Sequence, residues 1–186
     1  MSSMKPIVVF LVHLAFTFAT RCRLLEASCQ APSFTVEAAC RAAAGTEYMY
    51  ELCRDAMRDM SAPENQVSLY ALVAAKRALA SYGDTVQALA GMLRNASHQD
   101  ERKAYMLCAD RYRDSGDTMR GVADELNGCR FAGLGQRYRD GIAQLESCRD
   151  RLFKAMSSPL YAMNLLDRNK AILAYFVGRL LAGVDP

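Results

Sequence analysis

The sequence contains no tryptophan and only two histidines, His13 and His98, among its 186 residues. Short catalytic motifs are missing as well: there is no Gly-x-Ser-x-Gly, His-Glu-x-x-His, Walker loop or Cys-x-x-Cys pair. His98 has no evident partner for acid–base chemistry, no pair of carboxylates stands out, and the Glu-x-x-His pairs of di-metal bundles do not occur. We therefore expect a protein that is not an enzyme and that uses no cofactor, metal or small-molecule substrate.

Apolar runs long enough to span a membrane are also missing. The apolar stretch Ile7–Ala19 falls short of the roughly 20 residues that a bilayer requires, and no later segment approaches that length. Because this stretch follows a short polar start that carries Lys5, the pattern predicts a secretory signal peptide in residues 1–27. Cleavage after Ala19 or after Ala27 fits the pattern, and a membrane anchor or a buried N-terminal helix is the alternative.

Neither positive nor negative charge is in large excess. The formal net charge is only +3 and falls close to neutrality without residues 1–27, so we expect no nucleic-acid partner and no membrane binding after signal removal. Secretion places the remaining cysteines in an oxidising compartment. Six cysteines follow residue 27, and six allow fifteen pairings, so composition alone does not choose among them. Asn95-Ala96-Ser97 is a sequon in a polar stretch, which predicts a glycosylated turn at Asn95.

Apolar residues recur with helical spacing from residue 33 onward, and no strand-like alternation competes with this pattern. The clearest segment, Glu101–Leu126, has one apolar seam with a single polar break. The members of this seam are Tyr105, Cys108, Tyr112, Ser115, Met119, Val122 and Leu126. We expect Asn127-Gly128 to end the helix, because glycine adopts the left-handed cap conformation without penalty.

The segment before it predicts a helix about 45 Å long. Ser61–Glu64 resembles a capping box with a proline in the first turn, which indicates the start of this helix. Its inward seam is expected to be Val67, Ala71, Ala74, Ala78, Tyr82, Val86, Leu89 and Leu93. A second apolar row, made of Leu69, Leu72 and Leu79, indicates packing against two neighbours.

Two further helices complete the pattern. One is expected from about Gly135 to Met156, and Ser158-Pro159 opens the other with an N-cap and a first-turn proline. Their expected inward residues are Tyr138, Ile142, Leu145, Cys148, Leu152, Met163, Leu166, Leu173, Val177 and Leu180. Four long helices joined by short turns predict an all-α fold, an up-down-up-down four-helix bundle over residues 61–182.

Residues 33–60 predict a smaller element. Two short helical stretches, Phe34–Ala43 and Tyr48–Met60, are broken at Gly45-Thr46 and form an N-terminal helical hairpin that is too small to hold its own core. A disulfide between Cys40 and Cys53 would join its two arms.

The remaining cysteines allow one natural pairing and leave one question open. Cys108 and Cys148 lie on the inward seams of two helices that we expect to be antiparallel neighbours, so a bridge between them is geometrically natural. Cys29 and Cys129 are left to pair, to stay free or to link two chains.

This combination resembles the plant invertase and pectin methylesterase inhibitor family over about residues 33–182. Local similarities support the likeness, and they lie in Tyr50-Glu51-Leu52-Cys53, in Leu107–Tyr112 followed by Gly121–Leu126, and in Leu145–Asp150 followed by Ser158-Pro159-Leu160 and Asn164. The resemblance implies a disulfide-stapled hairpin on a four-helix bundle. It also implies a secreted inhibitor in the apoplast or cell wall, with the vacuole as a second location.

Within this family the resemblance offers two enzyme partners, acid invertase or pectin methylesterase, each in a one-to-one complex. Invertase inhibitors carry a Pro-Lys-Phe motif after the second long helix, and the matching place here is Cys129-Arg130-Phe131. Arg130 could pair with a carboxylate and Phe131 could fill an apolar subsite, which favours invertase slightly. A second hypothesis is a helical-bundle carrier or signalling protein without inhibitory activity.

Overall fold

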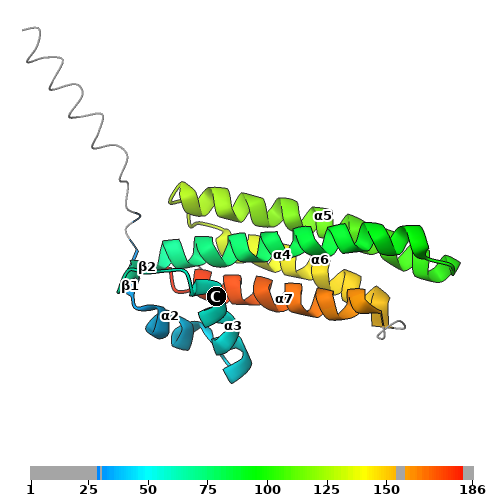
Figure 1. Ribbon diagram of the computed structural model, residues 1–186. Helices are drawn as coiled ribbons and strands as arrows, with labels where there is room; N and C mark the ends of the chain where they lie inside the picture. The colour runs from blue at the N-terminus through cyan, green and yellow to red at the C-terminus, as the bar shows by residue number, and fades with distance from the viewer. Residues whose placement is uncertain (1–28, 30, 154–157, 182–186) are drawn as a thin grey trace, which may run out of the picture. The chain divides into compact units, whose positions relative to one another are not determined.

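The computed structural model describes residue 29 and residues 31–153 and 158–181 (Figure 1). The chain divides into two compact units, Met1–Gln30 and Ala31–Pro186, and every helix and strand described below belongs to the second unit. The predicted signal peptide and both of its candidate cleavage sites lie outside the described residues. Among the described residues, no helix is both long enough and apolar enough to cross a membrane.

Four long helices form the core of the second unit (Figure 1): α4 (Val67–Asn95), α5 (Gln99–Asn127), α6 (Leu134–Leu152) and α7 (Pro159–Gly178). Each packs against the next along the chain, and α4 also packs against α7, so the helices close into a ring. Because successive helices are joined by short connections, they run antiparallel. The predicted up-down-up-down bundle is therefore confirmed.

The seam predicted along α5 faces the core over its whole length. All seven of its residues are buried, and Ser115, its one polar member, donates a hydrogen bond to the Gly141 carbonyl of α6 at 2.9 Å. This bond satisfies the hydroxyl, so the polar break costs little. The predicted start of α7 is also correct, because Ser158 caps the helix by accepting a hydrogen bond from the Leu160 amide at 3.3 Å.

The predicted start of α4 is wrong. The helix begins at Val67, well after the box at Ser61–Glu64, and its N-cap residue Gln66 makes no side-chain capping bond. Instead, two short strands that the sequence did not predict, β1 (Ser33–Phe34) and β2 (Asn65–Gln66), form an antiparallel pair just before the helix. The Val67 amide donates to the Pro32 carbonyl at 2.9 Å, so a backbone acceptor replaces the expected side-chain cap.

Three residues expected on packed apolar faces are exposed instead, and one of them is Leu69 of the second apolar row, which is 41% exposed. Val86 of α4 and Leu166 of α7 are 43% and 40% exposed, whereas their chain neighbours Thr85 and Asp167 are each 1% exposed. Thr85 Oγ1 donates to Asp167 Oδ2 at 2.6 Å, which satisfies both buried groups. The spacing of apolar residues cannot identify Thr85 or Asp167 as buried, because both side chains are polar.

The N-terminal helical hairpin consists of α2 (Val36–Ala43) and α3 (Glu47–Met57), as predicted apart from its boundaries. Thr35 and Thr46 cap the two helices by accepting hydrogen bonds from backbone amides. The hairpin packs against α4 and α7, which supply the core that it lacks. A disulfide joins its arms, with the Cα atoms of Cys40 and Cys53 5.6 Å apart.

Candidate functional site

The backbone of the α5–α6 turn is shaped by a left-handed residue at Cys129, whose φ is 53°. The Cys129 amide donates to the Leu126 carbonyl at 3.2 Å and the Arg130 amide to the Glu125 carbonyl at 2.8 Å, which is the hydrogen-bond pattern of a Schellman motif. Gly128 has a φ of −88°, so the expectation that it takes the left-handed cap is wrong. The motif closes one residue later than the glycine suggests.

The two residues singled out in this turn are placed differently. Arg130 is exposed, and its guanidinium lies over the end of α5, 3.5 Å from the Asp124 carbonyl. A cation is favoured there by the partial negative charge of a helix C-terminus. Phe131 is half-buried and packs against the hydrophobic core. The structure therefore leaves the Arg130 charge exposed to solvent, whereas Phe131 anchors the turn to the core.

An ion pair fixes the other side of this turn. Arg137 Nε of α6 lies 2.9 Å from Glu125 Oε1 of α5, and the Glu125 side chain is only 17% exposed. The second carboxylate oxygen of Glu125 is buried and has no hydrogen-bond partner among the described residues. Arg130 and Arg137 thus place two guanidinium groups, both partly exposed, at the same end of the bundle.

The sequon lies at the opposite end of the bundle. Asn95 is the last residue of α4, it is exposed, and only three residues separate α4 from α5. An exposed asparagine at a helix end is accessible to glycosylation, so modification of Asn95 stays a prediction.

Disulfides tie the bundle as well as the hairpin. Cys108 of α5 is bonded to Cys148 of α6, both are fully buried, and their Cα atoms lie 4.7 Å apart. Cys29 and Cys129 are also disulfide-bonded, so neither is a free thiol. Both pairings considered in the sequence, Cys40–Cys53 and Cys108–Cys148, are thus present.

A buried polar cluster in the bundle was missed by the sequence analysis. The Asp167 carboxylate accepts hydrogen bonds from Ser81 and Thr85 of α4 and from Tyr112 of α5. Asn164, one turn earlier on α7, is fully buried and donates to the Tyr112 hydroxyl at 3.3 Å. In the sequence, Asn164 and Asp167 are merely polar residues at helical spacing from apolar ones, and such spacing is weak evidence that a polar residue is buried.

Burial raises the pKa of three tyrosines of the core far above the ordinary value of 10, and these are Tyr82, Tyr112 and Tyr138. For Tyr112 the nearby Asp167 carboxylate adds to the effect, because a phenolate beside a carboxylate is repelled. These hydroxyls therefore stay protonated at any physiological pH, and that of Tyr112 donates to Asp167 Oδ2.

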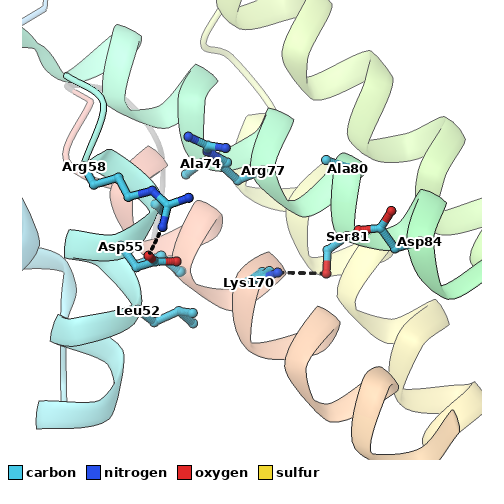
Figure 2. Close-up of a pocket in the computed structure, with 11 residues that line it drawn as sticks. Leu52, Asp55, Arg58, Ala74, Arg77, Ala80, Ser81, Asp84 and Lys170 are labelled. Atoms are coloured by element: carbon cyan, nitrogen blue, oxygen red, sulfur yellow. Dashed lines mark hydrogen bonds and ion pairs between the residues drawn. The ribbon is translucent and has the colours of Figure 1, made fainter. Parts of the chain in front are cut away.

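A pocket of about 200 Å³ lies between the hairpin and the bundle, lined by residues of α3, α4 and α7 (Figure 2). Charged side chains of both signs surround it, among them Asp55, Asp84 and Lys170. Within the part of the chain that the structure describes, no group of three or more His, Cys, Asp and Glu side chains is arranged to hold a metal ion.

Comparison with solved structures identifies the fold. A mutant form of a pectin methylesterase inhibitor from Arabidopsis matches with a TM-score of 0.67 and 13% identity, over 78% of this chain and 96% of that one. Another pectin methylesterase inhibitor structure, from Arabidopsis thaliana, matches with a TM-score of 0.59 and 13% identity, over 78% of this chain and 95% of that one. No family model and no curated protein matches the sequence. The likeness predicted from the sequence is confirmed for the fold.

Proposed function

We propose that the protein is a secreted inhibitor that reversibly blocks the active-site cleft of a plant cell-wall carbohydrate-active enzyme. The observation that carries this proposal is the likeness to structures of pectin methylesterase inhibitors, because it extends over nearly their whole length. The hairpin disulfide and the buried Cys108–Cys148 bridge suit a rigid binding surface in an oxidising compartment. Preorganisation of this kind lowers the entropic cost of forming a complex.

Two targets are supported by different observations. The names of the matching structures favour pectin methylesterase. Acid invertase is favoured by Arg130-Phe131, since the exposed Arg130 guanidinium can pair with a carboxylate of a sugar-binding cleft. Burial of part of Phe131 against the core leaves less of its ring for an apolar subsite. We expect a one-to-one complex in the apoplast, cell wall or vacuole.

The deciding experiment is a titration of the oxidised mature protein into pectin methylesterase and, separately, into acid invertase, near pH 5. Loss of activity in one assay alone identifies the target. If neither activity falls while the disulfides are intact, the inhibitor proposal is wrong and a carrier or signalling role gains support.

The contribution of the α5–α6 turn is measured with variants. If invertase is the target, the double substitution Arg130→Ala with Phe131→Ala is expected to abolish inhibition. The single variant Arg130→Ala separates contact from folding, because its side chain is exposed while Phe131 packs against the core. Arg94→Ala, an exposed arginine at the opposite end of the bundle, is the matched control. Equal inhibition by all these variants would show that the turn makes no contact with the enzyme.

Secretion has its own test in a plant expression host. N-terminal sequencing of the exported protein should find a chain beginning after Ala19 or Ala27. The variant Asn95→Gln should lose the mass of one N-glycan relative to the wild type. A chain that keeps residues 1–27 and carries no glycan would contradict the secreted assignment.

A further inference from the structure

The pocket between α3, α4 and α7 has a mixed lining that suits a small polar ligand. Leu52 of α3 and Leu173 of α7 supply apolar surface, whereas Ser81, Asp84 and Lys170 supply polar groups. Its volume of about 200 Å³ is smaller than the roughly 300–1,000 Å³ of pockets for drug-sized molecules. A ligand of one ring is therefore the appropriate size.

The arginines at the rim of this pocket already have carboxylate partners. Arg58 Nη1 lies 3.1 Å from Asp55 Oδ1 (Figure 2), and Arg77 pairs with Asp59. Lys170 differs, because among the described residues its ammonium forms no ion pair and donates only to Ser81 Oγ, at 2.9 Å. An ammonium group has three N–H donors, so two remain for a ligand.

Hydrogen bonds to the buried cluster fix the position of the Lys170 ammonium. The Ser81 hydroxyl donates a hydrogen bond to the Asp167 carboxylate, so the lone pairs of the hydroxyl oxygen are free to accept one from Lys170. Asp167 is itself held by Thr85 and Tyr112. This chain of hydrogen bonds runs from the core to the pocket wall and fixes a cation there. Figure 2 shows its last bond, from Lys170 to Ser81.

Asp84 provides the complementary group. It lines the same pocket from α4, one turn after Ser81, and among the described residues its carboxylate is in no ion pair. A carboxylate accepts hydrogen bonds from hydroxyl groups, whereas an ammonium attracts an anion. The pocket thus offers one anion-binding group and one hydroxyl-binding group beside an apolar wall.

We propose that this pocket binds a single-ring sugar acid, a polyhydroxy carboxylate of hexuronate size. Lys170 binds the carboxylate, Asp84 accepts hydrogen bonds from ring hydroxyls, and the apolar face of the ring lies against Leu52 and Leu173. This binding goes beyond the proposed inhibition, and its test needs no target enzyme, so the two proposals stand or fall separately.

The test is isothermal titration of the oxidised mature protein with D-galacturonate, and with D-galactose and acetate as probes that lack the carboxylate or the hydroxyls. Saturable binding of galacturonate that is at least tenfold tighter than binding of either comparison probe is expected. Lys170→Met should weaken galacturonate binding about tenfold or more. The control Lys76→Met, an exposed α4 residue outside the pocket lining, should bind as the wild type does.

A second variant separates binding from folding, because Lys170 also contacts the buried cluster through Ser81. Asp84 is exposed and lies outside that cluster. Asp84→Asn should therefore weaken galacturonate binding without changing the midpoint of thermal unfolding. Three results would overturn the proposal: no saturable binding by the wild type, equal binding of galactose or acetate, or an equal loss in Lys76→Met.

Discussion

The hydroxyl of Tyr112 on α5 donates a hydrogen bond of 2.7 Å to Asp167 Oδ2 on α7. These helices lie diagonally across the ring of four, so the bond passes through the interior rather than between neighbouring helices. Tyr112 is 1% exposed and also stacks edge-on with Tyr82 of α4, with ring centroids 5.9 Å apart. Asn164 Nδ2 of the same cluster also donates to the Leu145 carbonyl of α6 at 3.2 Å. One polar cluster therefore ties all four long helices together.

Tyr112→Phe is expected to lower the free energy of unfolding by about 1.5–3 kcal/mol. The substitution keeps the ring but removes a donor to a buried carboxylate, and hydrogen bonds to charged groups fall in that range. Urea unfolding followed by circular dichroism measures the loss. Tyr50→Phe is the control, since Tyr50 is half-buried and contributes its ring face to Arg41 and Arg54. Equal stability of Tyr112→Phe and wild type would show that the bond contributes nothing.

Most of the fold was predictable because helical spacing and short connections leave few arrangements for four long helices. Every seam residue of α5 is buried as expected, and the Ser158-Pro159 start of α7 is correct. The start of α4 was not predictable, since the acceptor for the Val67 amide is the Pro32 carbonyl, far away in the sequence. A local capping signal carries no information about such a partner.

The candidate sites were harder to predict for the same reason. Asp167 and Lys170 are joined by hydrogen bonds to Ser81, which lies more than eighty residues earlier in the sequence. Apolar periodicity selected Leu166 for the core, and the polar residue beside it was the one buried. The position of Arg130 after α5 was predictable, whereas the half-burial of Phe131 depends on how the turn packs onto the bundle.

The raised pKa values of the buried tyrosines predict a loss of stability in alkali. In the unfolded chain these phenols ionise near pH 10, whereas in the folded protein burial holds their pKa above that value. Their contribution is therefore complete below pH 10 and falls as the pH rises further, because only the unfolded state releases the protons. Urea unfolding at pH 8, 10 and 11 measures this decline.

A tyrosinate absorbance titration provides the check on this interpretation. Three of the nine tyrosines, Tyr82, Tyr112 and Tyr138, should ionise only when circular dichroism reports unfolding. Ionisation of all nine near pH 10 in a protein that is still folded would contradict the burial described here.

Gly178 on α7 is expected to tolerate no side chain. A Cβ built there would lie 2.8 Å from Cε2 of Tyr138, whose ring is fully buried. Gly178→Ala should therefore lower the free energy of unfolding by about 1–3 kcal/mol through overpacking. Gly83→Ala is the matched control, because Gly83 is an exposed residue inside α4 with no atom within 4 Å of the added Cβ. The free energy of unfolding of Gly83→Ala should rise by about 0.5–1 kcal/mol because alanine has the higher helix propensity. If both variants were less stable than the wild type, backbone effects rather than overpacking would explain the loss.

Removing the Cys40–Cys53 bridge and removing the Cys108–Cys148 bridge should have unequal effects. Cys108 and Cys148 are 40 residues apart, whereas Cys40 and Cys53 are 13 apart. In the chain-entropy model these loops correspond to about 4 and about 3 kcal/mol of stability, respectively. The double variant Cys108→Ala with Cys148→Ala should therefore unfold at a lower urea concentration than Cys40→Ala with Cys53→Ala.

Hydrogen exchange tests where each bridge acts. Loss of the hairpin disulfide should increase exchange mainly in α2 and α3, whereas loss of the bundle disulfide should increase it in α5 and α6. Reversal of this order would mean that the hairpin, through its packing on α4 and α7, stabilises the bundle more than the bond between α5 and α6 does.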